Sequence, residues 1–207
     1  MQQGPRASMR MSRVPGERAL RFEPLTPERW DDLAELFGPN GACGGCWCMW
    51  WKRTGPEFRR HKGASNRRSF KAQVDRGDVP GFLAYQQRQP VAWCAVEPRE
   101  RYPGLARSRA LAAVDDQPVW SITCLFIKAG HRRRGLSLAM LRHARRFVAS
   151  SGGRLIEGYP KDQQGNFTGA NTLWTGIATT FLKAGFNEVA RRTPKRPIMR
   201  ARLRPPI

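Results

Sequence analysis

The chain has 207 residues, and 40% of them are hydrophobic, which is enough for one domain with a core of its own. Its 37 lysines and arginines against 16 aspartates and glutamates give a formal net charge of +21, which favours anionic partners, nucleic acid included. The five cysteines, the lack of a membrane-spanning apolar stretch and the lack of a secretory segment predict a cytoplasmic protein with reduced thiols and no membrane partner.

Residues 1–18 are polar, rich in arginine and interrupted by prolines, so we expect a disordered tail in front of one domain over residues 19–204. A first strand is predicted over residues 19–25. Thr26 can cap the helix that follows to about residue 37, and the proline directly after it suits the first helical position.

Residues 43–51 have the most unusual composition in the chain, with three cysteines and three tryptophans. Cys43, Cys46 and Cys48, with His61 nearby, allow a zinc site, but the single residue between Cys46 and Cys48 is poor spacing for a tetrahedral cage. We therefore expect no metal. A catalytic thiol is a second interpretation, and it requires a base that lowers the pKa of the thiol.

The next elements follow from local patterns. A helix is predicted to about residue 76, capped by Ser65 or Asn66, and then a hairpin with Pro90 in its turn. The predicted hairpin strands are residues 81–85 and 91–96, and a long connection follows to residue 118. Later strands are expected at 154–159, 186–190 and 198–203, with a polar loop at 162–171 and a short helix at 177–184.

The stretch from residue 120 to 151 organises the rest of the chain. Residues 120–127 are β-branched and aromatic, as in a buried central strand, and a helix with one apolar face begins near Leu136. The arginines and Gly135 between them precede the helix N-terminus, where unpaired backbone N–H groups can hold a phosphate or pyrophosphate.

At these residues the chain resembles the GNAT superfamily of N-acetyltransferases, whose coenzyme A motif is Arg or Gln, two residues, Gly, one residue, then Gly or Ala. The matching residues are Arg132, Arg133, Arg134, Gly135, Leu136 and Ser137. Ser137 departs from the last position but is also small. The resemblance implies an α/β fold with a mixed, mostly antiparallel sheet, in which the fourth and fifth strands splay apart to admit the cofactor. It also implies acetyl-CoA as acyl donor, held by the backbone of Leu125, Phe126 and Ile127.

Two catalytic residues common among relatives are absent. The tyrosine position before the Gly-Phe pair is Phe181, and the acid position on the fourth strand lies near Thr123. We expect Glu157 to replace the base and Tyr159 the acid, because alternation puts both on one strand face. Two alternatives stay open: Glu157 as a buried ion-pair partner of an arginine, and Tyr159 as a packed aromatic. Glu97 is a lesser candidate near the acceptor.

The resemblance also implies that the loop after the first helix lines an acceptor pocket, with Trp47, Trp50 and Trp51 as walls, although core packing is the alternative for each. The predicted function is acetyl transfer to an amine of a small molecule or protein, by a monomer or homodimer. A catalytically inactive coenzyme A sensor is one alternative. A nucleic-acid-binding protein is another, and it lacks any recognised motif.

Overall fold

The computed structural model describes residues 20–162 and 173–204, so the predicted tail and nearly all of the polar loop lie outside the described residues. The described part forms a seven-stranded sheet in the order β1-β2-β3-β4-β5-β7-β6. All neighbours in it are antiparallel except β4 and β5. The strands are β1 (Leu20–Pro24), β2 (Gly81–Gln86), β3 (Gln89–Pro98), β4 (Trp120–Ile127), β5 (Leu155–Gly158), β6 (Asn187–Arg191) and β7 (Pro197–Arg202). The predicted fold class is confirmed.

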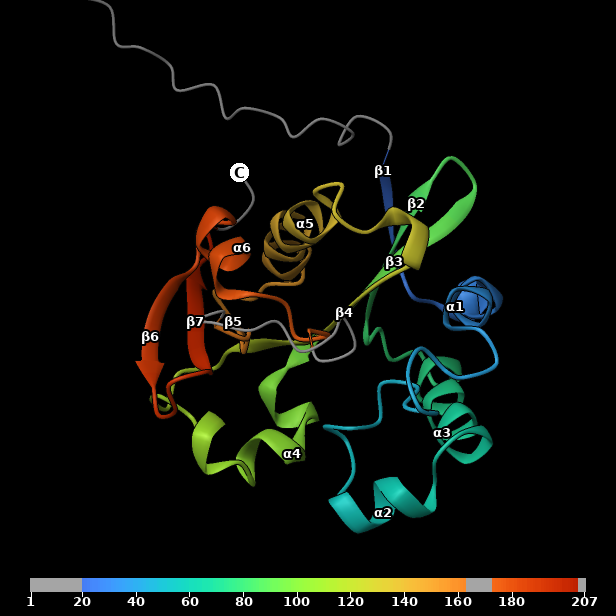
Figure 1. Ribbon diagram of the computed structural model, residues 1–207, viewed down its shortest axis with the longest axis horizontal. Helices are drawn as coiled ribbons and strands as arrows, with labels where there is room; N and C mark the ends of the chain where they lie inside the picture. Colours follow the sequence, from blue (N-terminus) through green and yellow to red (C-terminus); the bar gives the residue numbers. More distant parts are fainter. Residues whose placement is uncertain (1–19, 163–172, 205–207) are drawn as a thin grey trace, which may run out of the picture.

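Helices cover both faces of this sheet (Figure 1). The helices are α1 (Trp30–Phe37), α2 (Gly55–Arg60), α3 (Ala64–Asp75), α4 (Pro103–Ala106), α5 (Leu136–Ser150) and α6 (Ala178–Lys183). α5 and α6 lie on one face, and α1 to α4 lie on the other. Among the described residues, no helix is both long and apolar enough to cross a membrane.

The core is divided by the sheet. On the α5 face, apolar side chains of the central strands pack on the buried stripe of α5, as its helical spacing predicts. On the opposite face, α1 and α3 pack on a second cluster around Trp93, which is fully buried on β3. Burial on both faces explains why β3 and β4 read as almost continuous apolar runs.

Two local predictions differ from the structure, and one helix was not predicted. The additional helix is α2 (Gly55–Arg60), and a capping box begins it: Thr54 accepts from the Glu57 N–H, and Glu57 accepts from the Thr54 N–H. Neither Ser65 nor Asn66 caps α3, because the helix begins at Ala64 with Gly63 as its N-cap, and the Asn66 side chain instead donates to the Gly45 carbonyl at 3.0 Å. Pro90 lies within β3 at an irregularity of the β2–β3 pairing, where the strand does not need its N–H.

His143 on α5 provides a test of the packing between α5 and β1. Its ring stacks on Phe22, with centroids 4.2 Å apart, and meets Phe82 edge-on. Burial, and then the charge of Arg146, lower the pKa of His143 from 6.5 to about 4, against a weaker opposing effect of Glu23.

As the pH falls, the His143 imidazole is therefore protonated in the unfolded chain at a higher pH than in the folded chain. We expect the His143 contribution to stability to be complete above pH 6.5 and to be lost progressively between pH 6.5 and about 4. Urea unfolding of wild type and His143→Gln across this range measures the effect, and the variant should lose stability less steeply with falling pH. Equal slopes in the two proteins would contradict the packing that we describe.

Candidate active site

A β-bulge interrupts β4 in its middle. Ala95 pairs with Cys124, but the next residue of β3, Val96, pairs with Ile122, so Thr123 is an extra residue on β4. Ile122 packs in the α5-side cluster, whereas Cys124 packs in the cluster on the opposite face. The bulge thus interrupts the alternation of β4 side chains between the two faces of the sheet. It lies where the pairing of β4 with β5 ends.

Beyond the bulge, β4 and β5 separate. Their parallel ladder has three pairs and ends at Ile122 and Gly158. In the opening, the Leu125 N–H donates to the Trp174 carbonyl at 2.6 Å, and the Lys161 N–H donates to the Gly176 carbonyl at 2.9 Å. The segment 173–177 therefore bridges the two strands where the resemblance places the pantetheine arm.

The connection from β4 to α5 presents free backbone donors. Arg133 and Gly135 have positive φ angles of 58° and 79°, which turn the chain sharply before Leu136 begins α5. Within the described chain, no N–H from residue 133 to 137 donates to a backbone carbonyl, and α5 has no side-chain cap. Arg132, Arg133 and Arg134 are exposed around these groups. Arg132 donates its Nε–H to the Ile127 carbonyl at 3.1 Å, which holds this side chain at the end of β4. The residues present fit a bound pyrophosphate, because the backbone N–H groups point out of the helix start and exposed arginine side chains lie next to them.

A buried polar cluster lies next to the bulge on the α4 side. Glu97, which is 3% exposed, has Lys52 Nζ 2.5 Å from its Oε2 and Arg101 Nε 3.5 Å from its Oε1. The Tyr102 hydroxyl lies beside the side chains of Thr123 and Glu97, in neither case with the full geometry of a hydrogen bond. Burial and the charge of Glu97 raise the pKa of Tyr102 well above its usual value. The Tyr102 hydroxyl thus lies between Glu97 and the bulge at Thr123.

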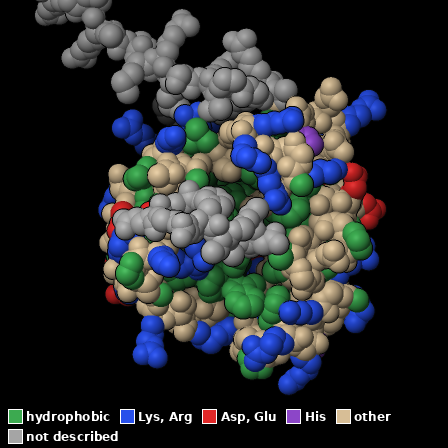
Figure 2. All heavy atoms as spheres, in the orientation of Figure 1, with side chains coloured by type: hydrophobic (Ala, Val, Ile, Leu, Met, Phe, Trp, Pro, Cys, Tyr) green, Lys and Arg blue, Asp and Glu red, His purple; other side chains and the backbone are tan. Residues whose placement is uncertain are grey.

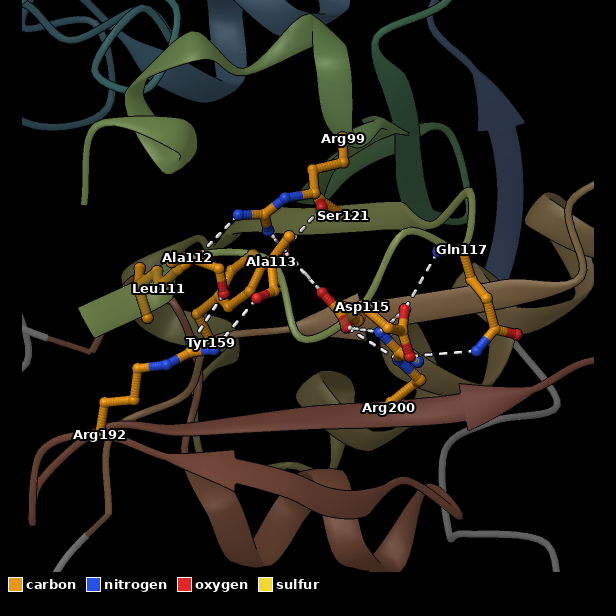
Figure 3. A network of polar contacts seen from close by, with 11 residues as sticks. Arg99, Leu111, Ala112, Ala113, Asp115, Gln117, Ser121, Tyr159, Arg192 and Arg200 are labelled. Carbon is orange, nitrogen blue, oxygen red and sulfur yellow. Dashed lines mark hydrogen bonds and ion pairs between the residues drawn. The ribbon is translucent and has the colours of Figure 1, made fainter. Parts of the chain in front are cut away.

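Glu157 and Tyr159 share one face, as alternation predicts, but both belong to one buried network of hydrogen bonds. Figure 3 labels Tyr159, Ser121, Arg99 and Arg200 of this network. Tyr159 Oη receives a hydrogen bond from Arg99 at 2.7 Å, lies 2.7 Å from Ser121 Oγ and donates to Glu157 at 3.2 Å. Glu157, which is 1% exposed, binds Arg200 on β7 at 2.7 Å.

The same network continues beyond Arg200. The Arg200 guanidinium also binds both carboxylate oxygens of Asp115, and the pKa of Asp115 is lowered to about 2 by these hydrogen bonds. Burial and the charge of Glu157 raise the pKa of Tyr159 above its usual range. This geometry matches the ion-pair alternative for Glu157. The catalytic roles of Glu157 and Tyr159 stay predictions that their surroundings do not favour.

The three tryptophans after α1 lie in different environments. Trp47 is 4% exposed and stacks on Trp30, with ring centroids 5.9 Å apart, so it packs in the core. Trp50 is 45% exposed and rests edge-on against Phe58. Trp51 faces Trp174, the residue that bridges the opening, at 6.1 Å. Among the three, Trp51 is the one placed beside the strand opening, and its spacing in the sequence does not distinguish it from its neighbours.

The face viewed in Figure 2 shows hydrophobic side chains gathered around a central hollow, with lysines and arginines spread around them. Acidic side chains are few on this face. An apolar opening with a basic surround suits a ligand with an apolar arm and an anionic end.

Phe181 occupies the position where relatives carry a tyrosine. Its ring is fully buried and packs so closely on β5 that a Cβ on Gly158 would lie 2.1 Å from it. A tyrosine there would bury its hydroxyl among apolar groups, so phenylalanine suits the local packing better than tyrosine does. In the residues that the structure covers, no group of three or more His, Cys, Asp or Glu side chains could hold a metal ion.

No protein-family model and no curated protein matches the sequence. Solved structures do match. A GNAT-family acetyltransferase from Listeria monocytogenes has 11% identity and a TM-score of 0.52, over 89% of this chain and 95% of that one. The PaiA N-acetyltransferase of Thermoplasma acidophilum, solved with coenzyme A, has 10% identity and a TM-score of 0.51, over 88% and 98%.

A polyamine N-acetyltransferase from Drosophila melanogaster, an enzyme that forms N-acetylagmatine, has 10% identity and a TM-score of 0.50, over 89% of this chain and 100% of that one. At these identities the likeness concerns the fold. The chain has the fold of the GNAT N-acetyltransferases.

Proposed function

We propose that the chain is an acetyl-CoA-dependent N-acetyltransferase that acts on an amine by direct attack on the thioester. The observation that carries this proposal is one continuous arrangement on β4. The bulge at Thr123, the separation from β5 and the free N–H groups before α5 follow one another along the same strand and its connection. Two of these features are known at functional sites, because β-bulges are over-represented next to active sites and helix N-termini bind phosphates.

The roles of the chain's own residues follow from this arrangement. The N–H groups of residues 133–137 and the adjacent arginines would hold the pyrophosphate of the cofactor, which supplies the activated acetyl group. The Leu125 N–H would face the thioester carbonyl after the Trp174 carbonyl releases it. Most of the rate enhancement in such a transfer comes from positioning, which contributes up to about 7–11 kcal/mol in favourable cases.

We assign the proton acceptor to Glu97 in preference to Glu157. Both carboxylates are buried and ion-paired, but they lie on opposite sides of Ser121 in the sheet, since Glu97 pairs with Ser121 from β3 and Glu157 from β5. Of the two carboxylates, Glu97 is the one whose side chain lies beside the Tyr102 hydroxyl, and this hydroxyl also lies beside Thr123 at the bulge. Tyr102 provides the path by which the proton moves away from the amine.

Glu97→Gln is expected to lower kcat/KM by about 10²-fold or more, because it keeps the size of the side chain and removes the base. The matched control is Glu157→Gln, which also removes one charge from a buried ion pair. Both should be assayed at a temperature at which circular dichroism shows them folded. A larger fall in Glu157→Gln than in Glu97→Gln would reverse our assignment.

The function itself is tested by release of free coenzyme A thiol from acetyl-CoA, measured against a panel of amines, with reactions that lack amine as controls. Amine-dependent release supports the proposal. Tight coenzyme A binding without release for any amine supports the sensor alternative. If the protein binds no coenzyme A but does bind nucleic acid, the nucleic-acid-binding alternative is supported instead.

A further inference from the structure

The side chain of Lys52 places an amine directly on the carboxylate that we assign as proton acceptor. Lys52 lies in the connection between α1 and α2, and its side chain is only 7% exposed. Its Nζ lies 2.5 Å from Glu97 Oε2 and 5.1 Å from the centre of the Tyr102 ring, over the face of that ring. A carboxylate on one side and an aromatic face on the other together form a binding site for an ammonium group.

Among the lysines whose ion pairs the structure describes, Lys52 is the buried one. Lys71 pairs with Asp75 on the surface of α3, and its side chain is 46% exposed. Glu97 also has a second cationic neighbour, because Arg101 Nε lies 3.5 Å from its other carboxylate oxygen. Glu97 would therefore keep a partner if Lys52 lost its charge, which limits the cost of neutralising Lys52 in this buried position.

Lys52 also lies beside the opening between β4 and β5. Trp51, its neighbour in the chain, faces Trp174, with ring centroids 6.1 Å apart. The Trp174 carbonyl accepts from the Leu125 N–H, the group that would face the thioester carbonyl in the proposed function. The flexible four-carbon stem of a lysine can carry its amine from Glu97 toward this opening.

Two buried donors next to Lys52 lack an acceptor. Within the described residues, neither the Trp51 indole N–H nor the Tyr102 hydroxyl has a hydrogen-bond partner. A buried donor that is left unpaired is unfavourable, and each such group in a folded protein requires an explanation. The carbonyl oxygen of an acetyl group on Lys52 would bring a hydrogen-bond acceptor to this place.

We propose that Lys52 is a site of self-acetylation, at which the chain moves one acetyl group from acetyl-CoA to its own Lys52 Nζ when no other amine is bound. This rests on the proposed function, which supplies the acyl donor. The Lys52 ammonium gives a proton to Glu97, and the nitrogen lone pair then attacks the thioester carbonyl, so that an N–C bond forms. The C–S bond breaks, and the departing sulfur takes the extra proton from the nitrogen. The products are a neutral amide and coenzyme A thiol, and Glu97 returns its proton to water.

The experiment incubates the full chain with acetyl-CoA and no amine, and then maps acetyl groups by mass spectrometry of peptides. We expect one acetyl group per chain at Lys52, together with a single burst of coenzyme A thiol that then stops. Lys71 is the internal control, because its exposed amine reports direct chemical reaction with acetyl-CoA. Since the site positions only the Lys52 amine, Lys71 should be modified about tenfold more slowly or less.

Two further controls test whether the reaction uses the cofactor site within one chain. Desulfo-coenzyme A, which has no thiol to carry an acetyl group, should block modification of Lys52 and leave the slow reaction of Lys71 unchanged. Dilution of the protein should not change the rate constant at Lys52, because donor and acceptor belong to the same chain. Lys52→Arg keeps the positive charge next to Glu97 and should abolish the burst.

The outcomes separate this proposal from the proposed function. Acetylation of Lys52 that is no faster than that of Lys71, or that desulfo-coenzyme A does not block, would overturn self-acetylation, and neither comparison depends on the folding of a variant. An unmodified Lys52 in a protein that acetylates an added amine would refute the proposal and leave the proposed function standing. Acetylated Lys52 without turnover of any amine would support the proposal and count against transfer to a free amine alone.

Discussion

Gly135→Glu is expected to abolish coenzyme A binding while the protein stays folded. Gly135 is exposed and has a φ of 79°, directly before α5 and among the free N–H groups of residues 133–137. A glutamate side chain there brings a negative charge into the place of the pyrophosphate, so it opposes the helix N-terminus and the arginines together. Isothermal titration with coenzyme A measures the effect, and circular dichroism checks the fold.

The control separates charge from backbone strain. Gly135→Asn tolerates a positive φ better than other substitutions and adds no charge, so it should retain measurable binding. Affinity should also fall modestly as salt rises in the wild type, because screening weakens the attraction between the arginines and the phosphates. If Gly135→Glu binds coenzyme A as tightly as wild type, the pyrophosphate does not lie at this helix N-terminus.

Glu157→Gln is expected to destabilise the protein by about 3–5 kcal/mol, the usual cost of removing one partner from a buried ion pair. Arg200 is 9% exposed, and Asp115 would then be its remaining carboxylate partner among the contacts described. Tyr159 would also lose the carboxylate that accepts its hydrogen bond. This contact lies where β4, β5 and the connection after β3 meet. Urea unfolding, followed by tryptophan fluorescence, measures the change.

The matched control is Glu188→Gln, which removes a carboxylate from an exposed pair with Arg191 and should cost about 0–1 kcal/mol. The result also decides between the two interpretations of Glu157 that the sequence left open. If Glu157→Gln keeps wild-type stability but loses turnover, Glu157 is the base and our assignment of Glu97 is wrong.

The positions of the strands and helices near the candidate site could be predicted because they depend on local patterns. Strand β4 and the buried stripe of α5 agree with predictions from β-branched composition and helical spacing. The helix α2 could also have been predicted, since Thr54 and Glu57 have the spacing of a capping box. These features need only residues that are neighbours in the chain.

The sequence by itself determined the sheet-and-helix order, the arginine-glycine connection before α5 and the alternation that puts Glu157 and Tyr159 on one face. Only the tertiary structure decided what these residues contact. The bulge at Thr123 exists in the register between two strands, and the partner of Glu157 is Arg200, on another strand of the sheet. Periodicity specifies which face a side chain takes, whereas its partner depends on how distant segments pack together, and that packing has no local signal.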